Sequence, residues 1–306
     1  MAGNSAHRHA FLRAVKSAAV FSPAKLNLFL AVTGKRADGY HELLSVAAPL
    51  DFGDDLVAEE SSGFTLECDS ADVPVDDSNL VLKAAAAFAA ATGWRGGAHF
   101  RLAKRIPVGA GFGGGSSNAV AALRALNELS GGAAGDAQLA QIAAELGSDC
   151  PLFLENFPVL MRGRGERVEP LPAAAAPRLR GRRVLLFKPG FAIGTAWAYG
   201  KMAAAAPRSY LESAAAAARV AAWCAGHAPA EELLFNNMEP VALAKFPALP
   251  LLLEKLRGES GVAARMSGSG SACFALLRDD FVTAPLVARI RECWGPSAFV
   301  REARLA

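Results

Sequence analysis

The sequence predicts an α+β fold in two halves. Short stretches with alternating apolar residues, typical of strands, intermingle with longer stretches of helical spacing, without a regular strand–helix–strand order. The segment 170–177 is rich in alanine and proline and indicates a seam. A length of 306 residues suits two domains. We therefore expect an extension over residues 1–20, an N-terminal domain over 21–175 and a C-terminal domain over 176–306.

The first strand is predicted over residues 24–32. Leu26, Leu28, Leu30 and Val32 alternate there with Lys25, Asn27 and Phe29. A period of two predicts a half-buried strand, with Lys25 and Asn27 together on the face opposite the leucines. Glycine and aspartate then cluster over 34–39, which indicates a loop.

The next elements surround a glycine-rich segment. We predict a helix over 78–91, a strand over 98–102, a glycine-rich loop over 107–117 and a helix after it. A further helix begins with Asp136 as its N-cap and ends at Gly147. Asp149 therefore lies just beyond a helix end, in a turn before Pro151.

Beyond the seam, the pattern predicts a strand over 184–187, then helices, then a Ser-Gly-Ser-Gly-Ser turn over 267–271. A strand over 272–277 and a last strand near Phe299 follow. The sequence shows no internal repeat of the length that marks a solenoid or a propeller.

Composition limits the classes of function. Hydrophobic residues make up 52% of the chain, charged residues 20%, and the net charge is +3. This balance indicates a globular protein and gives no argument for a nucleic-acid partner. The five cysteines include no C-x-x-C pair and no histidine has metal-ligand spacing, so we expect a reducing cytoplasm and no protein metal site. No apolar run is long enough for a membrane helix, so we expect no membrane partner.

The first residues are basic and include His7, Arg8, His9 and Arg13. They lack the continuous apolar region of a secretory signal. A transit peptide is one interpretation, and a disordered or start-site extension is the one that we favour.

The glycine-rich loop is the most informative segment. Glycines allow the backbone to approach a phosphate closely, and the following helix adds its free N–H groups and positive dipole end. The segment is not a Walker A loop, because no Gly-Lys-Ser/Thr follows. A dinucleotide pattern is present, but no second strand ending in an acidic residue follows. A flexible loop with a serine N-cap is the plainer interpretation, but five glycines immediately before a helix favour anion binding. The candidate phosphate-binding residues are Pro107, Val108, Gly109, Ala110, Gly111, Phe112, Gly113, Gly114, Gly115, Ser116 and Ser117.

Two charged residues complete a possible reaction centre. Alone, Lys25 is typical of a solvated strand lysine, and Asp149 is typical of a capping aspartate. Together with a phosphate loop they supply a positive charge and a proton acceptor, which phosphoryl transfer needs along with Mg²⁺.

Three segments resemble the GHMP kinase family, which includes galactokinase, homoserine kinase, mevalonate kinase and phosphomevalonate kinase. They are Pro-Ala-Lys-Leu-Asn-Leu over 23–28, the glycine-rich loop with Gly-Gly-Gly-Ser-Ser-Asn-Ala, and the turn over 267–271. The resemblance implies ATP as co-substrate with Mg²⁺, and a two-domain GHMP kinase fold. In that fold the N-terminal domain is like domain 2 of ribosomal protein S5, and the C-terminal half is ferredoxin-like.

Three further segments, 34–43, 147–151 and 236–240, resemble the branch of this family whose small-molecule substrate is a cytidine diphosphate-linked methylerythritol. This resemblance implies that Asp149 takes the proton of the substrate's 2-hydroxyl and that Lys25 orients or polarises the pair. It also implies that Asn27 touches the substrate, Tyr40 stacks on cytosine and His41 hydrogen-bonds the base.

The remaining site residues are likewise implied by resemblance. Tyr199 would cover the other face of the cytosine ring, with Thr195 nearby, while Asn79 and Lys104 would lie near adenosine. The segment 195–199 departs from the family pattern, so Trp197 competes with Tyr199 as the stacking residue. Phe112 replaces a usual leucine and Ser148 a common alanine.

Two rival functions stay open. One is another GHMP kinase, of the homoserine or mevalonate type. Tyr40 and His41, and the absence of an evident carboxylate-binding arginine pair near Lys25, speak against it. The other is a sensor that binds ligand without turnover. Retention of Lys25, Asp149 and the complete loop makes it the weaker rival.

Overall fold

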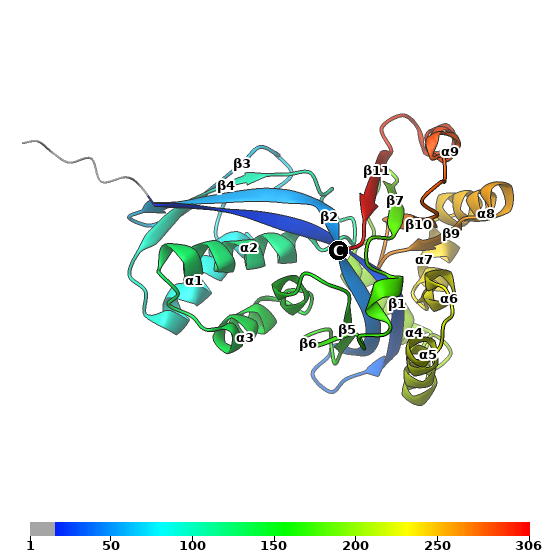
Figure 1. The fold of residues 1–306 in the computed structure, drawn as a ribbon, viewed down its shortest axis with the longest axis horizontal. Coiled ribbons are helices and arrows are strands. Elements are labelled where there is room, and N and C mark those ends of the chain that lie inside the picture. Colours follow the sequence, from blue (N-terminus) through cyan, green and yellow to red (C-terminus); the bar gives the residue numbers. More distant parts are fainter. Residues whose placement is uncertain (1–15) are drawn as a thin grey trace, which may run out of the picture.

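The computed structural model describes residues 16–306 (Figure 1). The basic residues His7 to Arg13 lie outside the described part of the chain, so their interpretation as an extension stays a prediction. The first strand begins at Ser17, inside the predicted extension, so residues 17–20 belong to the sheet.

The N-terminal half is built on two long antiparallel strands, β1 (Ser17–Lys35) and β2 (His41–Ser61). With β3 (Phe64–Cys68), β4 (Gly97–Ala103) and β8 (Phe235–Asn236) they form a sheet of order β3-β4-β2-β1-β8. A short hairpin of β5 (Val159–Arg162) and β6 (Arg167–Pro170) extends from β2. The predicted strands at 24–32 and 98–102 are confirmed, whereas β2 and the hairpin have no counterpart in the prediction.

Three helices cover one face of this sheet (Figure 1). They are α1 (Leu80–Thr92), α2 (Gly114–Leu129) and α3 (Asp136–Leu146), followed by a 3₁₀ turn over Pro151–Leu154. All three were predicted. Asp136 is the first helical residue, and Gly135 is the N-cap in its place. Asp149 lies between α3 and the 3₁₀ turn, as predicted.

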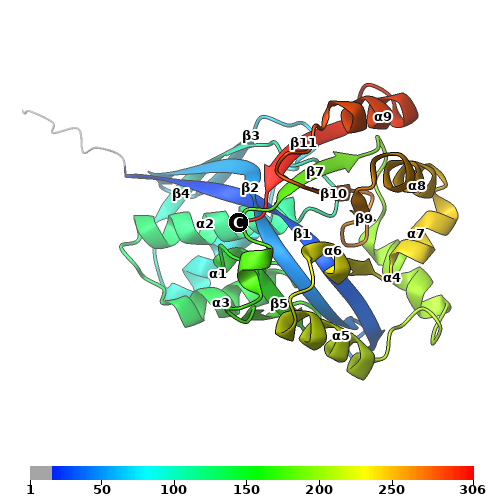
Figure 2. The ribbon, with the colours of Figure 1, turned by 45° about the vertical axis from the view of Figure 1, so that its right-hand side comes forward.

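The C-terminal half contains an antiparallel sheet of order β11-β7-β10-β9 (Figure 2). Its strands are β7 (Arg183–Lys188), β9 (Ala263–Met266), β10 (Cys273–Leu277) and β11 (Phe299–Arg304). A 3₁₀ turn (Ala176–Arg178) precedes the half, and the helices are α4 (Thr195–Ala204), α5 (Ser213–Ala225), α6 (Ala230–Leu233), α7 (Glu239–Lys245), α8 (Ala248–Ser260) and α9 (Ala284–Trp294). The expected α+β class is confirmed.

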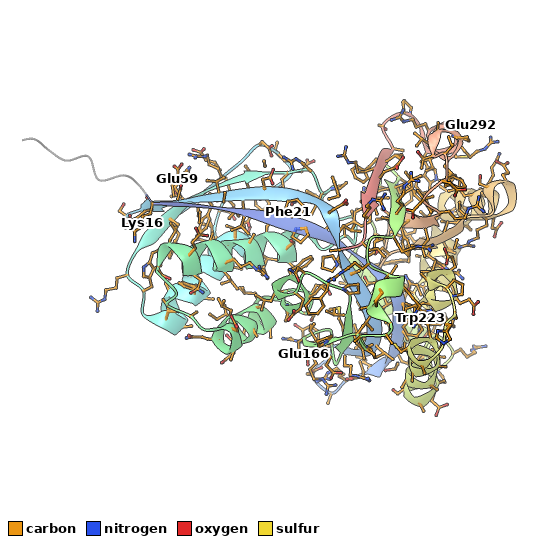
Figure 3. All side chains as sticks on the ribbon, in the orientation of Figure 1. Lys16, Phe21, Glu59, Glu166, Trp223 and Glu292 are labelled. Atoms are coloured by element: carbon orange, nitrogen blue, oxygen red, sulfur yellow. The ribbon has the colours of Figure 1, made fainter. Side chains whose placement is uncertain are left out.

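Residues 24–32 of β1 are buried on both faces, so the prediction of a half-buried strand there is wrong. The register against β2 shifts between Asn27 and Phe29, which makes a β-bulge at Leu28. The bulge reverses the alternation, so Leu30 packs in a different apolar cluster from Leu26 and Leu28. The cluster of Leu26 and Leu28 includes Trp223 of α5, labelled in Figure 3. The C-terminal half therefore covers the face of β1 that carries Leu26 and Leu28.

The two halves share backbone pairing as well as side-chain packing. β8 belongs to the C-terminal part of the chain, yet it pairs in parallel with β1. Leu305 at the other end of the C-terminal half forms a bridge with Leu50 of β2. The two long strands β1 and β2 extend from the helices α1 to α3 at one end to the helices α4 and α5 at the other (Figures 1 and 2). None of the helices within residues 16–306 combines the length and the apolar character needed to cross a bilayer.

Candidate active site

A cavity of about 1000 Å³ lies between the two halves and contains nearly every predicted site residue. It is lined by β1, the glycine-rich loop, the turn that carries Asp149, helix α4 and the turn at 268–269. The predicted residues that line it are Lys25, Asn27, Tyr40, His41, Asn79, Lys104, Pro107, Val108, Gly109, Ala110, Gly111, Phe112, Gly113, Gly114, Gly115, Ser116, Asp149, Thr195 and Tyr199. Ser117 is buried outside the cavity wall.

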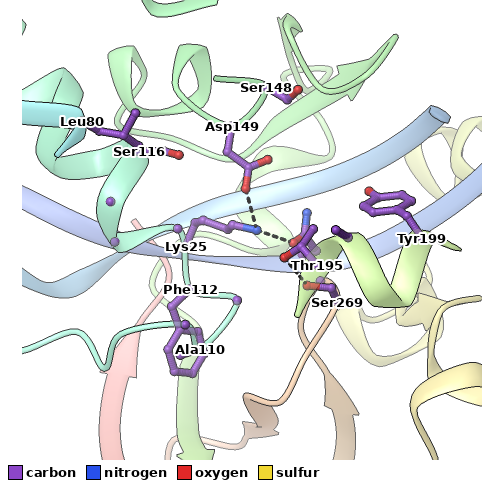
Figure 4. A pocket seen from close by; sticks show the side chains of 18 of the residues that line it. Lys25, Leu80, Ala110, Phe112, Ser116, Ser148, Asp149, Thr195, Tyr199 and Ser269 are labelled. Atoms are coloured by element: carbon purple, nitrogen blue, oxygen red, sulfur yellow. Dashed lines mark hydrogen bonds and ion pairs between the residues drawn. The ribbon is translucent and has the colours of Figure 1, made fainter. Parts of the chain in front are cut away.

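Lys25 and Asp149 meet at the centre of the cavity (Figure 4). The Lys25 Nζ lies 3.2 Å from Asp149 Oδ2 and donates to Asn27 Oδ1 at 2.6 Å. The Lys25 side chain is almost fully buried, whereas that of Asp149 is 39% exposed. Lys25 and Asn27 share one face of β1, as the strand alternation predicts, because the bulge begins only after Asn27.

The orientation of Asn27 is fixed by a chain of hydrogen bonds. Its Nδ2 donates to Ser45 Oγ at 2.9 Å, and Ser45 Oγ donates to the Phe29 carbonyl at 2.7 Å. The amide oxygen of Asn27 is therefore turned toward Lys25. This arrangement holds the lysine ammonium between a fixed amide and a carboxylate that reaches solvent.

The glycine-rich loop packs directly against Lys25. The Lys25 N–H donates to the Phe112 carbonyl at 2.9 Å. Gly113 has a φ of 75°, and a Cβ added there would lie 3.0 Å from Lys25 Cγ and 2.7 Å from Phe153 Cζ. Only glycine combines this backbone conformation with so close an approach. The loop therefore lies in direct contact with the side chain of Lys25.

The loop leads into α2, which begins at Gly114 with Gly113 as its N-cap. The serine N-cap of the plainer interpretation is not observed, because both serines lie in the first turn. Ser116 faces the cavity, whereas Ser117 Oγ accepts from Ser22 Oγ at 2.8 Å. Because no side chain caps α2, its first N–H groups and positive dipole end are free to face an anion.

Asn79 and Lys104 lie on the side of the cavity formed by α1, β4 and α2. Asn79 is the N-cap of α1, where its Oδ1 accepts the Val81 N–H at 2.9 Å. The Lys104 ammonium pairs with the carboxylate of Asp54, which is fully buried. Lys104 thus lies beside the start of α2, and Asn79 lies at the rim of the same wall.

Aromatic side chains form the opposite end of the cavity. Tyr40 is 51% exposed, and the Arg164 guanidinium lies 4.8 Å from its ring centre. His41 is buried, with its ring 4.8 Å from that of Tyr199. Burial, and secondly the charge of Lys35, lower the pKa of His41, so the imidazole is neutral at pH 7.

Helix α4 separates the two aromatic residues that competed for the stacking role. Tyr199 lines the cavity, and burial followed by the charge of Asp149 raises the pKa of its hydroxyl, which stays protonated. Trp197 instead packs edge-on against Phe246 at 5.7 Å. Thr195 also faces the cavity, where its Oγ1 lies 3.0 Å from Ser269 Oγ (Figure 4).

Sequence reasoning missed several residues of this cavity. Ser45 and Arg164 lie on elements that were not predicted, β2 and the turn between β5 and β6. Asn118 and Ser269 lie in quoted motifs, but their roles were not assigned. Asp54, which lies behind the cavity wall as the partner of Lys104, carries no pattern of its own, since it is one acid in the run Asp51-Phe52-Gly53-Asp54-Asp55.

Comparison with known proteins identifies the class of protein. The chain matches the family models "GHMP kinases N terminal domain" over residues 79–155 and "GHMP kinases C terminal" over residues 221–294. The 4-diphosphocytidyl-2-C-methyl-D-erythritol kinase of Synechococcus elongatus is 36% identical over 292 residues, which cover 91% of this chain and 92% of the relative. That of Parvibaculum lavamentivorans is 40% identical over 263 residues, covering 83% and 86%.

Solved structures agree with these relatives. A crystal structure of 4-(cytidine 5'-diphospho)-2C-methyl-D-erythritol kinase matches with a TM-score of 0.75 at 33% identity, covering 94% of this chain and all of the other. A homoserine kinase from Cytophaga hutchinsonii shares the fold, with a TM-score of 0.72 at 19% identity and 96% of each chain covered. The chain therefore belongs to the GHMP kinases, which are ATP-dependent small-molecule kinases. Within that family its relatives over most of its length are the 4-diphosphocytidyl-2-C-methyl-D-erythritol kinases.

The buried imidazole of His41 predicts a pH-dependent stability. Its folded-state pKa is lowered, so below about pH 6.5, the ordinary histidine value, the unfolded chain binds the proton more readily. We expect the free energy of unfolding of the wild type to fall more than that of His41→Gln between pH 7.5 and 5.5. Urea unfolding at several pH values measures both. Equal losses for the two proteins would contradict the prediction.

Proposed function

We propose that this protein transfers the γ-phosphate of ATP to the 2-hydroxyl of 4-diphosphocytidyl-2-C-methyl-D-erythritol. The products are the 2-phosphate and ADP, and the reaction belongs to the non-mevalonate route to isoprenoid precursors. The observation that carries the proposal is the Lys25–Asp149 pair at 3.2 Å, placed between the phosphate loop and the aromatic end of one cavity. The relatives named above support the choice of substrate.

Asp149 is the proposed proton acceptor. Its carboxylate is partly exposed in the cavity, so an alcohol can reach it, and no helix or strand encloses it. As the hydroxyl attacks the γ-phosphorus, its proton passes to this carboxylate. Lys25 holds the carboxylate in place through the 3.2 Å contact, and its ammonium offsets the negative charge that develops on the phosphoryl oxygens.

The glycine-rich loop and the start of α2 are the proposed phosphate site. Gly109, Gly111 and Gly113 all have positive φ, which turns the backbone of the loop in ways that residues with a Cβ rarely adopt. The uncapped N-terminus of α2 follows immediately. Together they supply N–H groups and a positive dipole end to the phosphates of ATP.

Mg²⁺ is the proposed metal, held mainly by the nucleotide. The described residues contain no group of three or more His, Cys, Asp or Glu side chains that could hold a metal by themselves. Oxygen donors suited to Mg²⁺ do face the cavity, namely the Ser116 hydroxyl and the Asp149 carboxylate. One or two protein oxygens plus substrate phosphates are a common Mg²⁺ environment. When bound, the ion would neutralise charge between the β- and γ-phosphates.

The aromatic end of the cavity supports a nucleobase rather than a second charged group. Tyr40 offers an exposed ring, and Tyr199 and the neutral His41 offer a hydroxyl and an imidazole. We propose that Tyr40 stacks on cytosine, that His41 hydrogen-bonds its edge and that Tyr199 covers its other side. Asn27 and Thr195 would contact the rest of the substrate.

The function is tested by ADP release in a coupled assay with Mg-ATP and the cytidyl substrate, beside homoserine and mevalonate. We expect turnover with the cytidyl substrate only. Turnover with homoserine or mevalonate instead would keep the kinase class and overturn the proposed acceptor. Nucleotide binding without turnover on any acceptor would favour the sensor.

Replacing the proposed base should slow the chemical step. We expect Asp149→Asn to lower kcat by roughly 10²- to 10⁴-fold, because the amide cannot accept the hydroxyl proton. ATP binding should change little, since the phosphate loop is intact. Steady-state kinetics and calorimetry measure the two quantities, with Asp136→Asn on α3 as a control. A kcat near the wild-type value would rule out the role of Asp149.

Removing the exposed ring should weaken acceptor binding. We expect Tyr40→Ala to raise KM for the cytidyl substrate by an amount corresponding to about 1–3 kcal/mol, the range measured for protein–base stacking. Tyr40→Phe keeps the ring and serves as the matched control, so its KM should stay near that of the wild type. The KM for ATP should be the same in all three proteins. An unchanged KM for the acceptor in Tyr40→Ala would refute the stacking role.

A further inference from the structure

Asp54 of β2 is a fully buried carboxylate that touches no part of the Lys25–Asp149 centre. Its Oδ1 accepts the N–H groups of Arg105 at 2.7 Å and Ile106 at 2.8 Å. Its Oδ2 accepts from Asn118 Nδ2 at 2.8 Å and from the ammonium of Lys104. Four donors thus converge on one buried charge, which is the condition for keeping an ionised carboxylate in the interior.

The partner of Asp54, Lys104, lies at the start of α2. A Cβ added to Gly114, the first residue of that helix, would lie 3.2 Å from the Lys104 Nζ. The ammonium also donates to Asn118 Oδ1 at 3.2 Å, and its side chain is only 8% exposed. A buried cation beside the positive end of a helix is unfavourable on both counts, because it is desolvated and repelled. The carboxylate of Asp54 offsets both effects.

The same network ties the first turn of α2 to the sheet. Asn118 Nδ2 also donates to Ser22 Oγ at 2.8 Å, and Ser22 Oγ donates to Ser117 Oγ at 2.8 Å. Ser22 and Asp54 are paired across β1 and β2. The backbone that Asp54 holds, residues 105–106, leads directly into the glycine-rich loop at Pro107.

We propose that Asp54 is a positioning residue for ATP that acts through Lys104. It holds the ammonium beside the N-terminus of α2, so that a cation and a helix end, which would otherwise repel each other, face the same phosphate group. This inference rests on the proposed function, because it takes the nucleotide phosphates to bind at the glycine-rich loop. Neither the resemblance nor the loop motif points to Asp54.

The test is direct binding of a non-hydrolysable ATP analogue with Mg²⁺, measured by calorimetry without the acceptor. Asp54→Asn keeps an oxygen for the two backbone N–H groups and removes the charge that holds Lys104. We expect its Kd for the analogue to rise roughly tenfold, the size of one charge-assisted hydrogen bond. The KM for the acceptor should not change. Asp55→Asn on the same strand is the matched control: Asp55 is partly exposed and pairs with Arg105, so its Kd should stay within about twofold.

A double-mutant cycle separates action through Lys104 from a general loss of structure. If Asp54 acts through this lysine, Lys104→Gln weakens binding by a similar factor, and adding Asp54→Asn to it changes Kd little. Full additivity of the two effects would overturn the proposal. So would tighter binding by Asp54→Asn, which would mean that Asp54 only repels the phosphates.

Two further outcomes keep the inference separate from the proposed function. If the wild type binds no nucleotide, the kinase proposal itself fails. If the wild type binds and Asp54→Asn binds equally well, only the role of Asp54 fails. Should Asp54→Asn not fold, as judged by circular dichroism, Lys104→Gln alone decides, because an unchanged Kd in that variant removes the group through which Asp54 is proposed to act.

Discussion

The site depends on the burial of a lysine ammonium in the middle of the central strand. Lys25 is nearly inaccessible to solvent, and removing such a charge from water costs several kcal/mol unless partners replace the water. Asp149 and Asn27 provide those partners, and the Phe112 carbonyl accepts the backbone N–H of the same residue. One residue of β1 therefore fixes the turn with the proposed base and the loop proposed for phosphates. Movement of the turn would take the carboxylate away from a buried ammonium, and movement of the loop would leave the N–H of Lys25 without its acceptor.

The second constraint is that the C-terminal half closes the cavity over the glycine-rich loop. Gly111 has a φ of 88°, and a Cβ there would lie 3.0 Å from the Ser267 carbonyl oxygen. The turn at 267–271 is in its turn held by Asn236, whose Nδ2 donates to the carbonyls of Met266 at 3.0 Å and Gly268 at 2.8 Å. This contact gives the segment 236–240 a physical role: it fastens one loop of the cavity to the strand that pairs with β1.

The sequence predicted the local parts of the site and not the long-range ones. The glycine-rich loop and the shared face of Lys25 and Asn27 follow from short-range patterns, and the structure contains both. The bulge at Leu28 did not follow, because a bulge leaves no mark in an alternating apolar run and reverses which face each later residue takes. Asp54 was also hidden, because its importance comes from Lys104 and Asn118, residues far away in the sequence. Which of two adjacent serines faces the cavity depends likewise on a distant partner, Ser22.

Fold similarity by itself does not select the acceptor. The TM-scores with the cytidyl kinase structure and with the homoserine kinase structure are 0.75 and 0.72, whereas the identities are 33% and 19%. The glycine-rich loop and the charged pair suit the step common to the whole family, so the choice among alcohols must come from the other end of the cavity. There the rings of the neutral His41 imidazole and the protonated Tyr199 phenol lie 4.8 Å apart, beside the Tyr40 ring and the Arg164 guanidinium that lies 4.8 Å from its centre. Uncharged aromatic groups of this kind provide stacking surfaces and hydrogen bonds, which suit a pyrimidine base better than they suit a carboxylate.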